Sequence, residues 1–141
     1  MSLATTASVY LLEQDTGIAD TVRNLCAEKS LTLKRFKSTK DLLVAMTATA
    51  SPACVIAAND QPTGQALEIL EKLEIQKPEV PVIILGHHSD IASAVAVIKA
   101  GAIDYIEKPR IYGRLAEHLN QFIKRCTSLN LMPNRQKKHL Q

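Results

Sequence analysis

The chain has 141 residues, of which 46% are hydrophobic and 22% charged, a balance typical of one globular domain with its own core. No apolar run approaches the roughly 20 residues of a membrane-spanning helix, and the first residues do not resemble a signal peptide. Residues 1–126 contain 14 basic and 14 acidic side chains, so the net charge of +3 comes from Arg135, Lys137 and Lys138. The body of the chain is therefore not a general polyanion binder, and residues 127–141 are predicted to form a basic linker or tail.

The start of the chain and its cysteines give three further expectations. Residues 1–7 are interpreted as an N-terminal extension or cloning scar, and residues 8–126 as one domain. Cys26, Cys54 and Cys126 lie far apart in apolar stretches, which is typical of reduced core thiols and predicts a cytoplasmic protein. No residues have the spacing of metal ligands, so no metal site is predicted.

Five short apolar runs alternate with segments of helical periodicity. We predict strands at residues 8–12, 31–36, 53–58, 80–85 and 103–106. The run 53–58, "ACVIAA", is apolar throughout, as in a central parallel strand that is buried on both faces. The run 31–36, "LTLKRF", is more polar and predicts an edge strand.

A helix is predicted after each strand, because apolar residues recur there three or four positions apart. Ser38 with Asp41, and Ser89 or Asp90, are predicted to begin the second and fourth helices, and Gly101 to end the fourth. The apolar positions are Ile18, Val22, Leu25 and Cys26, then Leu42, Leu43 and Met46, then Leu67, Leu70 and Leu73, then Ile91, Val95 and Ile98, and finally Leu115, Leu119, Phe122 and Ile123.

Five β/α units with short connections predict an α/β fold with three layers, α/β/α. The expected architecture is a flavodoxin-like (βα)5 doubly wound parallel sheet with strand order 2-1-3-4-5. In such a sheet the functional site lies at the carboxyl ends of the strands, beside the switch point between strands 1 and 3. The loops that would build this site start at Glu13, Ala58, Gly86 and residues 107–109.

Several segments together resemble the receiver domain of bacterial two-component response regulators. The most specific is "AGAIDYIEKP" at residues 100–109, with a lysine before a proline after the fifth strand. "VPVIILGHHSD" (80–90), "LLEQD" (11–15) and "QPTGQALEIL" (61–70) match the fourth strand, the acidic cluster and the start of the third helix. The resemblance covers residues 8 to about 126.

The resemblance implies phosphoryl transfer from a histidine kinase to an aspartate, assisted by Mg²⁺. A carboxylate acts as the nucleophile, and oxygen ligands hold the Mg²⁺ that neutralises the phosphoryl oxygens. A lysine adds positive charge, and a hydroxyl on strand 4 binds the phosphoryl group.

This sequence departs from that set of residues at several positions together. Counting back from Pro62 places the phosphoacceptor at Ala58, which has no nucleophile. The acidic pair falls on Glu13, which keeps a carboxylate on a longer side chain, and on Gln14, which is neutral. The position of the strand-4 hydroxyl falls on Gly86.

His87 follows at a position that is normally small. Lys108 is retained and is expected in the pocket beside Glu13, and Tyr105 occupies the position of the switch aromatic. Glu13, Gln14, Ala58, Gly86, His87 and Lys108 are therefore interpreted as a vestigial phosphorylation pocket, with Mg²⁺ binding weak or absent.

The preferred interpretation is a degenerate receiver domain that is not an enzyme and acts through protein–protein contacts, without phosphorylation, to control transcription. The resemblance implies a homodimer through the fourth helix, fifth strand and fifth helix, around residues 92–99, 104–107 and 114–121. Other partners would be a histidine kinase or another signalling protein. DNA would be contacted only through an output domain that this chain lacks, and no membrane contact is predicted.

Two alternatives stay open. Asp60 could be the acceptor of a working phosphoacceptor domain together with Glu13, although it lies too close to Pro62. The crevice could instead hold a small ligand, as in flavodoxin-like binding domains. Against this second alternative, "EQDTG" at residues 13–17 has a single glycine and is no glycine-rich phosphate loop.

Overall fold

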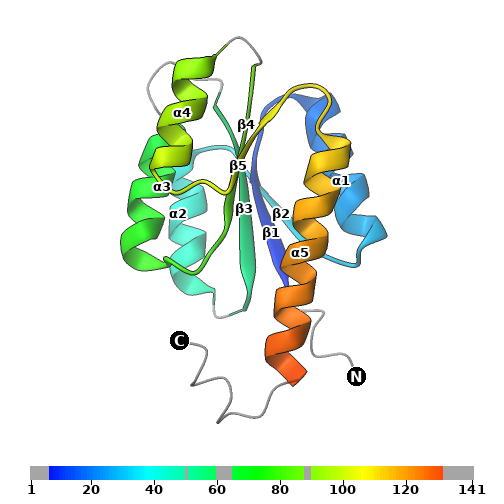
Figure 1. Ribbon diagram of the computed structural model, residues 1–141. Helices are drawn as coiled ribbons and strands as arrows, with labels where there is room; N and C mark the ends of the chain where they lie inside the picture. Colours follow the sequence, from blue (N-terminus) through cyan, green and yellow to red (C-terminus); the bar gives the residue numbers. More distant parts are fainter. Residues whose placement is uncertain (1–6, 50, 60–64, 88–89, 132–141) are drawn as a thin grey trace.

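The computed structural model describes residues 7–49, 51–59, 65–87 and 90–131, which form an open α/β sheet (Figure 1). All strand pairs are parallel and their order is β2-β1-β3-β4-β5, so the predicted fold class and strand order are confirmed. The elements are β1 (Ser8–Leu12), α1 (Thr16–Glu28), β2 (Thr32–Phe36), α2 (Thr39–Ala48), β3 (Ala53–Ala58), α3 (Gln65–Gln76), β4 (Val82–Gly86), α4 (Ile91–Lys99), β5 (Asp104–Glu107) and α5 (Tyr112–Leu131).

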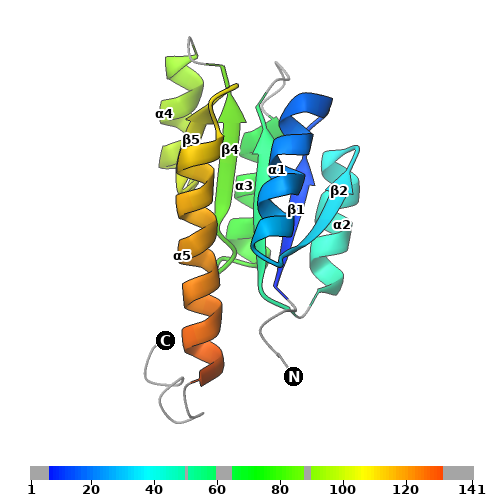
Figure 2. The same ribbon diagram turned by 90° about the vertical axis from the view of Figure 1, so that its right-hand side faces the viewer.

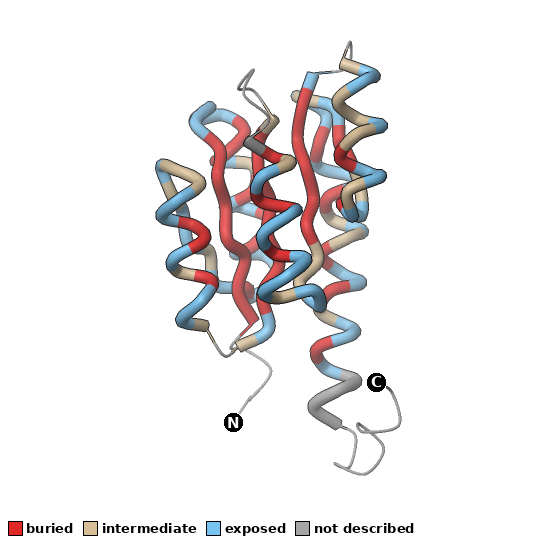
Figure 3. The backbone as a smooth tube through the Cα atoms, turned by 90° about the vertical axis from the view of Figure 1, so that its left-hand side faces the viewer, coloured by how far each residue is buried: buried red, intermediate tan, exposed pale blue. Residues whose placement is uncertain are grey.

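Helices cover both faces of the sheet. One face packs against α1 and α5, and the other against α2, α3 and α4 (Figures 1 and 2). Strands β1, β3 and β4 are buried along their whole length, whereas β2 is an exposed edge strand, as its polar sequence predicts (Figure 3). The sheet therefore divides the apolar side chains into two separate clusters.

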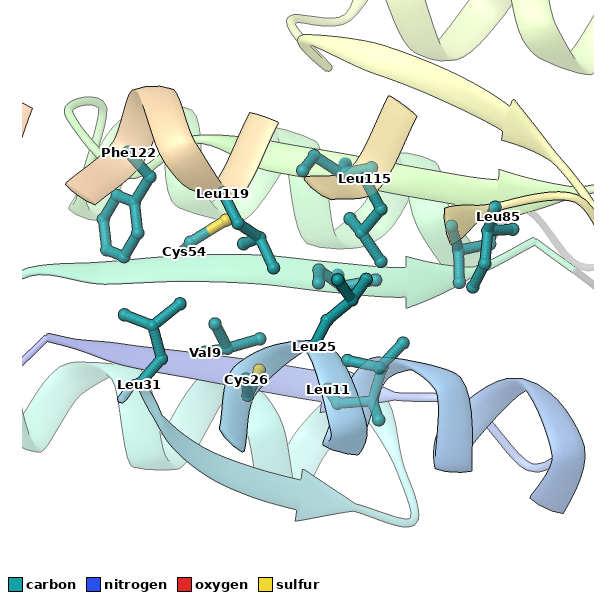
Figure 4. Close-up of a cluster of buried hydrophobic side chains, with 14 of the residues drawn as sticks. Val9, Leu11, Leu25, Cys26, Leu31, Cys54, Leu85, Leu115, Leu119 and Phe122 are labelled. Atoms are coloured by element: carbon teal, nitrogen blue, oxygen red, sulfur yellow. The ribbon is translucent and has the colours of Figure 1, made fainter. Parts of the chain in front are cut away.

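The cluster beneath α1 and α5 contains the cysteines (Figure 4). Cys26, Cys54 and Cys126 are free and buried, in agreement with their interpretation as core thiols. Burial raises the pKa of Cys26 to about 11 and that of Cys54 to about 12, because a thiolate loses its hydration there. These thiols are therefore protonated near neutral pH.

Local signals fix where several helices begin and end. The Ser38 side chain accepts a hydrogen bond from the Asp41 N–H at 3.1 Å, and Asp90 caps α4 by accepting from the Ser93 N–H at 3.2 Å. Gly101 has a φ of +114°, the conformation that lets glycine end α4. The alternative cap Ser89 lies outside the described residues.

The orientation of α4 differs from what its pattern suggests. Ile91, Val95 and Ile98 share one face, but they are 73%, 48% and 46% exposed, and the residue buried against the sheet is Val97. The face toward the sheet carries Val97, packed with Ala94 and Ala100, whose small side chains let the helix lie close to the sheet. Because both faces are apolar, the periodicity alone does not identify the buried one.

Helix α5 continues to Leu131, past residue 127, where the tail is expected to begin, so the division of the chain at residue 126 stays a prediction. Within the described residues, no helix is both long and apolar enough to cross a membrane.

Candidate functional site at the carboxyl edge of the sheet

The predicted site residues follow the carboxyl ends of four strands. Parallel pairing aligns Leu12 of β1 with Ala57 of β3, and Gly86 of β4 with Glu107 of β5. The pairing continues past β5, since the Lys108 N–H donates to the Gly86 carbonyl at 2.8 Å. The sheet thus brings residues from distant parts of the sequence to one edge.

Glu13 and Lys108 form a buried ion pair at this edge. The Lys108 Nζ lies 2.9 Å from Glu13 Oε1, with 9% and 0% of the two side chains exposed. The second carboxylate oxygen accepts from the Asp15 N–H at 3.0 Å, and Arg35 donates to the Glu13 carbonyl at 3.2 Å. Removing either charge would strand the other in a poorly hydrated site, so the two hold each other in place.

The two residues after Glu13 have local contacts of their own. Gln14 Nε2 donates to the Lys37 carbonyl at 3.3 Å, which ties the β1–α1 loop to the loop after β2. Asp15 Oδ1 accepts from the Ile18 N–H at 3.0 Å and caps α1. Gln14 is thus directed toward Lys37, and the Asp15 carboxylate stabilises the first turn of α1.

Gly86 and Tyr105 lie against each other at the end of β4. Tyr105 is 8% exposed, and its hydroxyl donates to the His87 carbonyl at 3.1 Å. A Cβ placed on Gly86 would lie 2.0 Å from the Tyr105 hydroxyl oxygen. The tyrosine therefore occupies the space that a longer side chain on β4 would need.

Ala58 ends β3 and is 8% exposed. Its methyl group supplies neither a nucleophile nor a metal ligand. Among the residues that the structure describes, no three histidine, cysteine, aspartate or glutamate side chains come together as a metal site. The Glu13 carboxylate at this edge is already paired with the Lys108 cation.

A second region of interest is the surface of α4 and its neighbours. Ile91, Val95 and Ile98 lie on one face of α4, and Ile103, in the connection from α4 to β5, is also 47% exposed. Helix α4 carries one charged residue, Lys99, so this surface is almost uncharged. Exposed apolar groups that cluster in this way are typical of sites of protein contact.

A charged network lies on the adjoining β5 and α5. Asp104 accepts hydrogen bonds from Arg114, and its other oxygen lies 2.7 Å from His118 Nε2. Asp104 is 13% exposed and His118 28%, so the network is partly shielded from water. These contacts fix the orientation of α5 relative to β5.

A cavity of about 350 Å³ lies at the opposite edge of the sheet, where the strands begin. It is lined by Ala53, Pro81, Phe122 and Cys126, with Lys77 and Arg125 among its polar residues. It is therefore separate from the carboxyl edge, where we predict the site.

The strand order and the lysine–carboxylate pair together define a doubly wound α/β domain with its site at the carboxyl edge of the sheet. The chain belongs to the family of the response regulator receiver domain, whose family model matches residues 9–120. As a member of this family it is a signalling domain and not an enzyme.

Curated relatives include transcription regulators. The chain is 25% identical over 124 residues to the transcriptional regulatory protein FixJ of Bradyrhizobium diazoefficiens, covering 88% of this chain and 60% of FixJ. It is 30% identical over 101 residues to the DNA-binding transcriptional regulator NtrC of Salmonella typhimurium, covering 72% of this chain and 21% of NtrC. The chain thus spans less than two thirds of these relatives.

Solved structures show the same fold. Full-length FixJ from B. japonicum superposes with a TM-score of 0.73 at 22% identity, over 92% of this chain and 70% of that chain. The receiver domain of NtrX from Brucella abortus gives a TM-score of 0.70 at 23% identity, over 83% and 98% of the two chains.

The structure brings some of the predicted residues together and separates others. Lys108 pairs with Glu13, as expected, whereas Gln14 turns toward Lys37. Asp60 lies outside the described residues. The contact between Gly86 and Tyr105 was not predicted, because residues 19 positions apart give no sign in the sequence that they compete for space.

The family implies a Mg²⁺ site, and the residues at this edge do not fit one. Mg²⁺ needs oxygen ligands in near-octahedral geometry. Here Glu13 pairs with Lys108, Asp15 caps α1 and Ala58 has no side-chain oxygen. Among the residues that the structure describes, the oxygen ligands that a divalent cation requires are therefore not assembled at this edge.

Proposed function

We propose that this chain is a degenerate receiver domain that signals without being phosphorylated. The observation that carries the proposal is the closed Glu13–Lys108 ion pair beside a strand that ends in Ala58. The lysine, which would otherwise balance a phosphoryl group, balances an internal carboxylate. Glu13, Gln14, Ala58, Gly86, His87 and Lys108 then form the remnant of a phosphorylation pocket.

Several residues that phosphorylation requires are changed at this edge. A phosphoryl group needs a nucleophile, a metal and a hydroxyl or cation to receive its charge. Ala58 lacks the nucleophile, the carboxylates are engaged elsewhere, and Tyr105 fills the place of a side chain at Gly86. A single substitution could be compensated, whereas these changes together affect the nucleophile, the metal ligands and the hydroxyl position on β4.

The proposed activity is contact with other proteins through α4, β5 and α5, and the proposed occupant of this surface is a second copy of the chain. Ile91, Val95 and Ile98 form a nearly uncharged stripe, which can pack against the same stripe of another copy about a two-fold axis. The Asp104–Arg114 pair on β5 and α5 is neutralised within one chain, so it adds no repulsion between copies.

The relatives suggest what such contacts would regulate. FixJ and NtrC are transcription regulators, and receiver domains interact with histidine kinases. We propose that this domain likewise influences transcription, through a DNA-binding domain or a partner protein, and that contact with a kinase would not lead to phosphate transfer.

Treatment with acetyl phosphate and Mg²⁺, followed by intact-mass measurement, tests the proposal. We expect no mass gain of one phosphoryl group, and a phosphorylatable receiver domain serves as the positive control. A hydroxylamine-labile adduct at Asp60 would instead support the alternative acceptor and contradict the proposal.

Restoring the acceptor alone gives a sharper test. We expect Ala58→Asp to remain almost unlabelled, because Gln14 is neutral and Lys108 still neutralises Glu13, so Mg²⁺ would meet a poor site. Labelling of this variant at the rate of a working receiver domain would show that the pocket has kept more of its function than we propose.

The small-ligand alternative stays a prediction for the same edge. Its test is a thermal shift on addition of nucleotides or flavins, since a ligand that binds the folded state raises the melting temperature.

A further inference from the structure

Gly86 has a steric reason to be glycine. Its ideal Cβ would lie 2.0 Å from Oη, 2.4 Å from Cζ and 2.9 Å from Cε2 of Tyr105. Non-bonded heavy atoms attract each other at about 3.5–4.0 Å and repel strongly at these distances. Glycine is therefore the residue that lets the tyrosine ring lie over the end of β4.

The ring is also held by a hydrogen bond to the segment that leads into α4. The Tyr105 hydroxyl donates to the His87 carbonyl at 3.1 Å. The same carbonyl accepts from the backbone N–H of Asp90 at 3.3 Å, and Asp90 is the N-cap of α4. One carbonyl thus links the tyrosine on β5 to the first turn of α4.

We propose that Gly86 and Tyr105 form a steric lock that fixes the start of α4, and with it the apolar surface of α4, in one conformation. The phenol oxygen takes the place of a side chain on β4, so the chain itself fills the position that would otherwise respond to a bound group. This inference rests on the proposed function, because the surface it holds is the proposed interaction surface.

The geometry explains why the locked state persists. Tyr105 is 8% exposed and packs in the apolar cluster beneath α2, α3 and α4. Moving the ring outward would leave unfilled space above Gly86 and remove the hydrogen bond to His87. Because the recess exists only at a glycine, the lock depends on both residues.

The first experiment adds one methyl group. With ¹³C-labelled tyrosine, we expect Gly86→Ala to shift the Tyr105 ring signal strongly and to lower the melting temperature by about 5 °C. Backbone signals of Ala92 to Val95 at the start of α4 should shift as well. Gly113→Ala, within α5, is the matched control, since a Cβ there would meet no atom within 4 Å; it should leave the Tyr105 and α4 signals unchanged and should not lower the melting temperature.

A double variant keeps the test decisive if Gly86→Ala folds poorly. In Tyr105→Ala the recess is empty, so adding Gly86→Ala should then change the melting temperature little. An equal loss from Gly86→Ala in both backgrounds, or an unmoved Tyr105 signal in the single variant, would overturn the lock.

Different measurements test the steric lock and the proposed function. Labelling of the unmodified chain by acetyl phosphate would defeat the proposed function and leave the lock standing. An unmoved Tyr105 ring in Gly86→Ala would defeat the lock and leave the proposed function standing. The lock also predicts that Gly86→Thr, which restores a hydroxyl to β4, displaces Tyr105 and shifts its ring signal as Gly86→Ala does.

Discussion

The carboxyl edge of the sheet and the surface of α4 differ in which side chains they bury and which they expose. At the edge, Glu13 and Lys108 are buried and form an ion pair, although charged groups usually face water or a ligand. On α4, Ile91, Val95 and Ile98 face water, although large aliphatic groups are usually buried. One region is closed by its own side chains, and the other leaves apolar groups uncovered.

This difference between the two regions bears on which of them is suited to contact other proteins. A site whose charges are already neutralised gains little from a ligand of either sign, since binding would first have to break the Glu13–Lys108 pair. An apolar helix face gains free energy from any partner that removes it from water, by about 25 cal/mol per Å². The comparison therefore favours contact through α4 over chemistry at the edge.

The largest expected loss of stability comes from removing the Lys108 charge at the carboxyl edge. Lys108→Met leaves the Glu13 carboxylate buried without a cation, and we expect a loss of about 3–5 kcal/mol in the free energy of unfolding. Denaturant unfolding measures it. Lys124→Met, at an exposed position on α5, is the control and should change stability by less than about 0.5 kcal/mol.

Removing both charges tests the same pair from the other direction. Glu13→Leu combined with Lys108→Met should regain most of the stability lost in the single variant, because a buried pair can often be replaced by apolar groups. If Lys108→Met alone were as stable as the unmodified chain, the edge would not be closed in the way described.

The next prediction compares the stability losses of two valine substitutions on α4. Val97 is 1% exposed and Val95 48%, so Val97→Ala should cost about 2 kcal/mol of folding stability and Val95→Ala less than about 0.5 kcal/mol. Thermal or urea unfolding of both variants tests this. Equal losses would show that α4 packs on the sheet through a different face.

Association should respond to the exposed face. Val95→Lys places a charge in the apolar stripe, and we expect the dissociation constant of the proposed dimer to rise at least about tenfold, or about 1.4 kcal/mol. Sedimentation over a range of concentrations measures it, and Lys124→Met is again the control. Unchanged association would exclude the stripe from the interface.

The fold could be predicted from the sequence because its signals are local. Apolar runs located the strands, Ser38 and Gly101 marked helix ends, and the uninterrupted run 53–58 identified a central strand. The pairing of Lys108 with Glu13 could be anticipated because the ends of parallel strands meet at one edge.

The remaining features depend on side-chain packing between segments far apart in the chain. The pattern of Ile91, Val95 and Ile98 predicts a helix, but it cannot identify the buried face when the other face is apolar too. The recess at Gly86 arises from the position of the Tyr105 ring, which no local pattern encodes. Periodicity predicts helices and strands, but it does not show how side chains from distant segments pack against each other.

The smallest expected effect concerns Cys54, in the core cluster beneath α1 and α5. The pKa of Cys54 is raised from 9.0 to about 12 by burial, so above pH 9 the unfolded chain releases this proton while the folded chain keeps it. The folded state then binds more protons, and stability falls as pH rises from about 9 toward 12. Between pH 8 and 10 this thiol should contribute a loss of about 1 kcal/mol. We therefore expect Cys54→Ala to lose less stability over that interval than the unmodified chain, as measured by urea unfolding at each pH. Equal losses in the two proteins would show that this core thiol does not cause the loss of stability at alkaline pH.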